Sequence, residues 1–181
     1  MKNSNLKSYP PSIKFLHWLI ALIVITMLAG SFFLEDLPKQ FQGSAYMLHK
    51  SFGLTILFLM ILRLIVVWIK GKPQLPVTTS SFEKKLAHLV QYSFYLFLIL
   101  MPFCGWIMSV AANKTPSYFG FFSLPLPIAP NKNLAMLMNQ SHKTIAWILI
   151  VLLVFHVAGA IKHHFIDKDV VLKRMLPGRF D

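Results

Sequence analysis

Four long apolar stretches, separated by polar, basic or proline-rich connections, constrain the fold more than any other feature of the sequence. Each approaches or exceeds the roughly 18 residues that mark a candidate transmembrane helix. We predict spans at about residues 13–34, 46–69, 86–112 and 141–163. A chain of 181 residues, 56% of them hydrophobic, leaves little room for a separate soluble domain. The sequence therefore predicts one membrane-embedded, all-α domain over residues 1–181, a four-transmembrane-helix bundle in the lipid bilayer.

A formal net charge of +12 suits either nucleic acid or a membrane surface as a partner. The lysines and arginines fall mostly between and beyond the apolar stretches, and no nucleic-acid-binding module is visible, so we expect no nucleic acid. Thirteen of the 18 lie in or beside the N-terminus, the connection between spans two and three, and the C-terminal tail. The positive-inside rule then predicts a multi-pass membrane protein with both termini in the cytoplasm.

Several local features lie within or between the predicted spans. Arg63 stands near the exit of span two, where its guanidinium can extend to the membrane interface. Pro102 and Gly105 predict a kink in span three. The connection at 113–140 contains the apolar segment FGFFSLPLP, which we expect to lie on the membrane surface as a lid or short interfacial helix. The single cysteine, Cys104, excludes an internal disulfide and any multi-cysteine iron–sulfur site.

Histidines are the ionisable residues that most suggest a function here, because ionisable side chains within membrane spans are rare. His142 and His156 stand fourteen residues apart in span four, so their imidazoles project from nearly the same helix face. The helical rise separates them by about 21 Å, near opposite sides of the bilayer core. In the predicted orientation, His49 shares the outer level with His142. His17 and His88 share the cytoplasmic level with His156.

A haem held by two imidazoles needs both ligands at matched depth on facing helices. His49 and His142 form the outer pair by this criterion. His156 pairs with either His17 or His88, since depth alone does not separate these two. Zinc is disfavoured because neither level offers the clustered Cys, His and carboxylate ligands that zinc sites use. Haem suits two axial imidazoles within apolar walls.

Four segments of the chain resemble the bacterial cytochrome b561 family of four-helix, di-haem b membrane proteins. They are SIKFLHWLIAL, MLHKSFGLTILFLMILRL, LAHLVQYSFYLFLILMPFCGW and SHKTIAWILIVLLVFHVAGAIKHHFIDKDVVLKRMLP, which cover the four spans and the tail. The resemblance implies haem ligands from spans one, two and four. It therefore implies two haem b groups, one held by His17 and His156 and the other by His49 and His142. His88 is left as a non-ligand that bonds a haem propionate or lines a nearby pocket.

Within this family the chain is most similar to the superoxide oxidase branch, the superoxide:ubiquinone oxidoreductases. That resemblance implies electron transfer from superoxide outside to ubiquinone near the cytoplasmic side. Because superoxide is an anion, Lys50 and Lys143, each directly after an outer ligand, are candidates for guiding it. Interfacial contacts or pairing with haem propionates would be their alternative roles.

His163 and His164, with Lys162 and Asp167 beside them, are candidates for the quinone site, because a quinone needs a proton donor that titrates near neutral pH. Alternatively, the KHH cluster is a topology signal that complements the helix dipole. A different functional interpretation also fits the sequence. The chain would then be a b-type electron carrier, the membrane anchor of a dehydrogenase or hydrogenase, which takes electrons from a donor protein.

Overall fold

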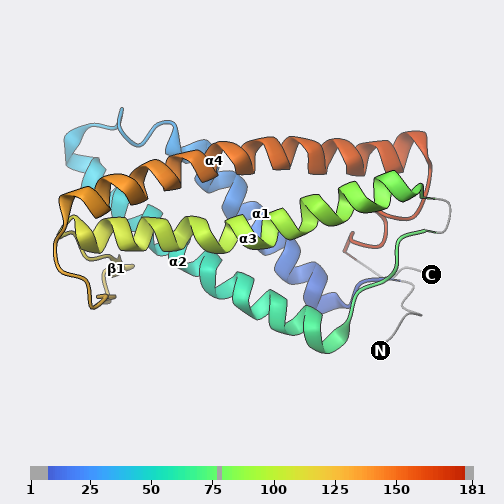
Figure 1. Ribbon diagram of the computed structural model, residues 1–181, viewed down its shortest axis with the longest axis horizontal. Helices are drawn as coiled ribbons and strands as arrows, with labels where there is room; N and C mark the ends of the chain where they lie inside the picture. Colours follow the sequence, from blue (N-terminus) through green and yellow to red (C-terminus); the bar gives the residue numbers. More distant parts are fainter. Residues whose placement is uncertain (1–7, 77–78, 178–181) are drawn as a thin grey trace.

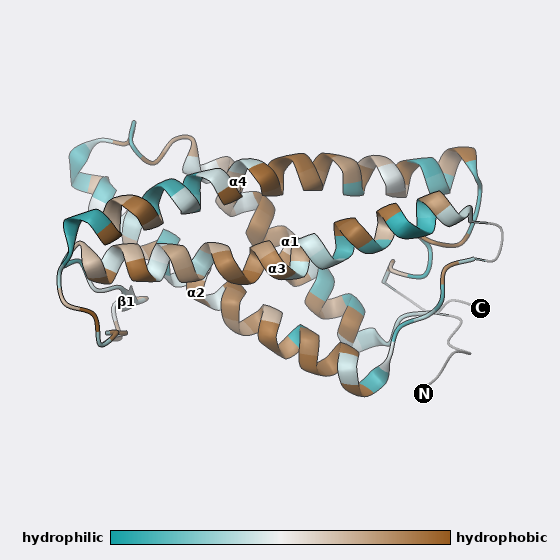
Figure 2. Ribbon diagram, viewed as in Figure 1, coloured by the Kyte–Doolittle hydropathy of each residue, from teal (hydrophilic) through white to brown (hydrophobic). Residues whose placement is uncertain are grey.

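The computed structural model describes residues 8–76 and 79–177, most of them in long helices (Figure 1). The elements in chain order are α1 (Pro11–Ser31), α2 (Lys39–Lys70), α3 (Ser81–Ala111), β1 (Ser117–Tyr118), β2 (Phe122–Ser123), α4 (Lys132–Ile161) and the π-helical turn η1 (Lys162–Ile166). Within the described residues, four helices are long and apolar enough to cross a membrane. Figure 2 shows apolar residues along their middle portions and polar residues toward their ends. The predicted four-helix membrane bundle is confirmed.

Two helices begin well before the apolar stretches predicted for them. α2 starts at Lys39 rather than at about residue 46, and α4 starts at Lys132 rather than at about residue 141. Hydropathy marks the part of a helix that suits lipid, whereas polar residues extend a helix equally well beyond it. The Asn131 side chain caps the early start of α4 by accepting a hydrogen bond from the Leu134 N–H at 3.0 Å.

The connection between α3 and α4 contains a small hairpin, so the short interfacial helix was wrong, while the alternative of a lid on the membrane surface stays a prediction. β1 and β2 pair antiparallel, and the turn between them places Phe119 and Gly120 at φ values of 49° and 82°. A positive φ is unfavourable for a side chain such as phenylalanine. The Ser51 hydroxyl of α2 supports this turn by accepting a hydrogen bond from the Phe119 N–H at 2.9 Å. The hairpin therefore depends on α2, a distant part of the sequence.

The helices pack in an order that leaves α4 close to only one neighbour. α1 packs on α2, α2 on α3, and α3 along α4, while the described backbone of α4 makes few close approaches to α1 or α2. Buried residues from all four helices form the core of the bundle. They are Leu16, Ile20, Val24, Leu28, Ile56, Met60, Leu98, Ile145 and Leu149. Side chains therefore bridge the space between α4 and the α1–α2 pair.

The two ends of the bundle differ in content (Figure 1). α1 begins and α4 finishes at one end, where the Tyr9 N–H donates to the Arg174 carbonyl at 3.4 Å. We call this the termini end. The β1–β2 hairpin lies at the opposite end, which we call the hairpin end. Because four helices run from end to end between them, the first and last described residues lie at the same end of the bundle.

Candidate functional site

Residues on α2 and α4 repeat at matching positions along the two helices. The α2 set is His49, Ile56 and Arg63, and the α4 set is His142, Leu149 and His156. Members of each set are seven residues apart, almost two helical turns, so each set follows one helix face. The middle members, Ile56 and Leu149, are buried in the core. The core therefore separates a level at the hairpin end from a second level at the termini end.

The hairpin-end level brings His49 and His142 together. Their ring centres are 6.2 Å apart and their planes lie at 65°. Two imidazoles bound on opposite sides of one metal atom place their ring centres about 6 Å apart, because each metal–nitrogen bond is about 2 Å and the rings add the rest. His142 Nδ1 lies 2.9 Å from the Met101 carbonyl. A carbonyl only accepts, so Nδ1 carries the proton and Nε2 keeps a free lone pair for a metal.

The termini-end level brings His17 and His156 together. Their ring centres are 6.0 Å apart with an interplanar angle of 66°, close to the geometry of the other pair. Phe94 of α3 packs edge-on against His156 at 5.4 Å. The Nδ1 atom of His17 is buried and, among the described residues, has no hydrogen-bond partner. The two imidazoles therefore lie in contact with each other, with His17 partly buried and His156 exposed on the surface of α4.

His88 lies apart from this pair. It is exposed on α3 and stacks on Tyr92, with ring centres 6.1 Å apart and planes at 26°. Of the two inner candidates that depth left open, His17 is the one in ring contact with His156. Arg63 has a buried Nε atom without a hydrogen-bond partner among the described residues, and the expectation that its guanidinium extends to the membrane interface stays a prediction.

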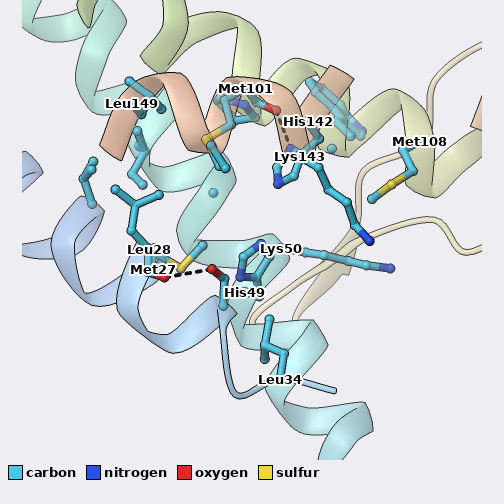
Figure 3. A pocket seen from close by; sticks show the side chains of 18 of the residues that line it. Met27, Leu28, Leu34, His49, Lys50, Met101, Met108, His142, Lys143 and Leu149 are labelled. Atoms are coloured by element: carbon cyan, nitrogen blue, oxygen red, sulfur yellow. Dashed lines mark hydrogen bonds between the residues drawn. The ribbon is translucent and has the colours of Figure 1, made fainter. Parts of the chain in front are cut away.

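A cavity of about 320 Å³ opens between His49 and His142 (Figure 3). Residues from all four helices line it, and most of the lining is apolar. Lys50 and Lys143 belong to the lining, and in Figure 3 their side chains extend toward the same side of the cavity. The Lys50 ammonium donates to the Lys114 carbonyl at 3.1 Å, while Lys143 is exposed. This cavity can take an apolar group between the imidazoles and an anion beside the lysines.

Gly105 lets α3 approach His142 closely. A Cβ atom added at residue 105 would lie 3.2 Å from both Cε1 and Nδ1 of the His142 ring. This contact is tighter than ordinary packing, so the ring would have to shift and weaken its bond to the Met101 carbonyl. The sequence suggested only that Gly105 contributes to a kink. Its role against the imidazole was missed, because it depends on which face of α3 meets α4.

We expect Gly105→Ala to loosen the binding of a ligand at the hairpin-end pair while leaving the fold intact. Alanine favours a helix over glycine by about 1 kcal/mol, so a loss of binding would not come from the helix itself. The measurement is the amount of haem retained on purification and the position of its Soret band. Gly30→Ala is the matched control, because a Cβ there meets nothing within 4 Å. Equal haem content and spectra in both variants would contradict this role for Gly105.

A polar cluster surrounds the end of α4. His163 Nδ1 lies 2.6 Å from Asp169 Oδ2 and 3.3 Å from Asp167 Oδ2. Lys162 binds Asp167 and also Glu83 at the start of α3, each at 2.7 Å. Lys162 and His163 belong to the π-helical turn η1, and such turns are frequent at functional sites. The sequence placed Lys162 and Asp167 beside His163 but missed Asp169 and Glu83.

His164 has different surroundings from His163. Its Nδ1 atom is buried and lacks a hydrogen-bond partner in the described part of the chain. Its ring packs edge-on against Phe165, with ring centres 4.7 Å apart. Of the two candidate proton donors, His163 is therefore the one joined to carboxylates.

A membrane bundle that brings histidines together in pairs at two levels is the architecture of a membrane-embedded cytochrome, an electron carrier. A family model described as prokaryotic cytochrome b561 matches residues 8–178. The chain belongs to this family, whose members bind b-type haem.

Curated relatives agree with this assignment over most of the chain. The chain is 36% identical to cytochrome b561 homolog 2 of Escherichia coli, over 88% of this chain and 86% of that protein. It is 30% identical to cytochrome b561 homolog 1 of the same organism, over 91% and 94%. It is 28% identical to the probable superoxide oxidase CybB of Yersinia pestis, over 90% and 92%.

Proposed function

We propose that this cytochrome b561 is a superoxide:ubiquinone oxidoreductase of the inner membrane, with the termini end in the cytoplasm and the hairpin end facing the periplasm. The observation that supports it most is the cavity beside His49 and His142 that Lys50 and Lys143 line. Two lysines at such a cavity would attract a small anion. The name of the Yersinia pestis relative, probable superoxide oxidase, supports the same substrate.

The two histidine pairs would hold two haem b groups, His49 with His142 and His17 with His156. The residues present fit this cofactor, because both pairs have the ring spacing that one metal atom requires. The proton on Nδ1 of His142 leaves Nε2 free as a ligand atom. When bound, haem b supplies one-electron redox chemistry at each level. His88 is not a ligand in this assignment.

At the hairpin end, the protein would collect and position superoxide. The Lys114 carbonyl fixes the Lys50 ammonium, whereas the exposed Lys143 is free to follow an approaching anion. Each superoxide that loses one electron leaves as dioxygen, a neutral molecule that the lysines no longer attract. Two superoxide anions supply the two electrons that one ubiquinone takes up.

At the termini end, the cluster at η1 would supply the two protons that reduction of ubiquinone to ubiquinol consumes. Asp169 accepts the Nδ1 proton of His163, so the Nε2 atom of this imidazole is available to exchange a proton with a quinone oxygen. Lys162 and Asp167 lie beside it at the same turn. His164, whose Nδ1 is buried without a carboxylate partner, would contribute to the wall of the quinone site.

Neutralising both lysines, Lys50→Gln with Lys143→Gln, should slow superoxide-driven haem reduction several-fold at low ionic strength, because the attraction for the anion is lost. The absorption spectrum should stay unchanged, since neither lysine is a haem ligand in this assignment. Stopped-flow spectroscopy with generated superoxide measures the rate. The wild-type rate should fall as salt is added, and the rate of the double variant should not.

Lys132→Gln provides the matched control for this experiment. Lys132 begins α4 at the same end of the bundle but does not line the cavity. Its removal changes the net charge without changing the site. Equal rates in the double variant, the control and the wild type at low salt would contradict guidance by Lys50 and Lys143.

The proposed activity is tested by adding generated superoxide to the purified protein anaerobically, with and without ubiquinone. We expect haem reduction by superoxide alone, followed by reoxidation when ubiquinone is present. Reduction that requires a partner dehydrogenase or hydrogenase would instead favour a membrane anchor that accepts electrons from a donor protein.

A further inference from the structure

Arg63 occupies on α2 the position that His156 occupies on α4. It follows His49 by fourteen residues, and His156 follows His142 by the same number. The guanidinium lies within electrostatic range of both His17 and His156. It also lies over the Tyr95 ring, with Cζ 6.0 Å from the ring centre. Arg63 is therefore a cation beside the termini-end histidine pair, inside a membrane span.

No carboxylate in residues 8–76 and 79–177 pairs with this arginine. The three described carboxylates at the termini end are already engaged. Glu83 and Asp167 bind Lys162, and Asp169 binds His163. The Nε atom of Arg63 is buried without a hydrogen-bond partner in the described structure. A half-buried cation within a membrane span is costly unless an anion pairs with it, so this position favours an anionic ligand.

Tyr9 links Arg63 with a second arginine at the termini end. Arg174, in the tail, also has a buried Nε atom without a partner among the described residues, while its Nη1 donates to the Gln74 carbonyl at 2.6 Å. Tyr9 lies within electrostatic range of both arginines, and burial raises the pKa of its phenol. A raised pKa keeps the phenol protonated at neutral pH, so Tyr9 is a hydrogen-bond donor and not the missing anion.

We propose that Arg63, with Arg174 and Tyr9, forms an oxyanion-binding site that takes a carboxylate of the haem held by His17 and His156. Two guanidinium groups and a phenol supply charged and neutral donors, and a guanidinium matches a carboxylate with two parallel hydrogen bonds. The phosphate of an anionic lipid offers similar chemistry, and the experiment below separates the two. The assignment rests on the proposed function, because it requires a haem at the termini end.

The test measures how fast the holoprotein transfers haem to a haem-scavenging apoprotein, for two forms of haem. One is haem b, and the other is haem b dimethyl ester, whose carboxylates carry no charge. Arg63→Gln should speed the release of haem b from the termini-end pair about tenfold, since a charge-assisted hydrogen bond is lost. It should hardly change the release of the ester, because the group that Arg63 binds is already missing.

Additional variants keep the test informative if Arg63→Gln folds poorly. Arg63→Lys keeps the charge but loses the paired geometry, so it should recover only part of the effect. Arg174→Gln, from another segment, should change release in the same direction by a smaller factor. Lys70→Gln removes one positive charge from the same helix two turns further on. This variant should release haem b and its dimethyl ester at the wild-type rates.

The outcomes separate the possible ligands. If the wild type carries two haems and Arg63→Gln releases haem b at the wild-type rate, the oxyanion-site assignment is overturned and the proposed function is not. An effect that persists with the ester, and appears only in nanodiscs containing anionic lipid, would assign the site to a lipid phosphate and also overturn it. A wild type without haem at the termini-end pair would overturn the proposed function together with this assignment.

Discussion

His49→Ala and His142→Ala should each purify with about half the haem of the wild-type protein. Each substitution removes one of the two imidazoles at the hairpin end, and a single remaining axial histidine binds haem far more weakly than two. The pair at the termini end lies on the other side of a packed core that includes Ile56 and Leu149, so its haem should remain. A pyridine haemochrome assay against protein concentration measures the ratio.

The complementary variants His17→Ala and His156→Ala should also keep about one haem, but at the other level. Because the cavity beside Lys50 and Lys143 would still hold its haem, superoxide should still reduce these variants. The His49 and His142 variants should lose that reaction. Full haem content in either hairpin-end variant, or superoxide reduction that survives in it, would contradict the pairing.

His163→Ala should slow quinone reduction at least about tenfold while leaving superoxide-driven haem reduction unchanged, because general acid catalysis contributes only to the protonation step. Asp169→Asn should cause a smaller loss in the same step, since Asp169 holds the His163 ring at 2.6 Å but does not itself deliver the proton. Reoxidation of the reduced protein by a ubiquinone analogue, followed anaerobically, gives the rate.

His88→Ala is a suitable control for His163. It removes an imidazole from the same end of the bundle, but His88 is exposed and stacks on Tyr92 rather than binding a carboxylate. We expect its quinone kinetics to match those of the wild type. If both haem reduction and quinone reduction fell equally in His163→Ala, His163 would not belong to the quinone site.

The number and order of the helices could be read from the sequence, because lipid tolerates only continuous apolar helices of sufficient length. The helix starts could be read only in part. The Ser80–Glu83 capping box, which marks the start of α3 at Ser81, was a readable signal that hydropathy alone ignores. The hairpin could not be predicted, since its turn is supported by Ser51, more than sixty residues away.

Depth along a helix was enough to group the histidines into levels, because the spacing of residues along a helix is fixed. It was not enough to choose between His17 and His88, since that choice depends on how helices rotate about their axes. The same limit hid the contact of Gly105 with His142. Arg63 had a usable signal, its fourteen-residue spacing from His49, which matches the spacing of the two histidines on α4.

The haem content of the wild-type protein is the most direct test of two metal-binding levels in one bundle. Purified anaerobically and assayed as the pyridine haemochrome, the chain should carry two haem b groups, with the spectrum of low-spin iron bound by two imidazoles. One haem per chain, or none, would contradict the assignment of His49 with His142 and of His17 with His156.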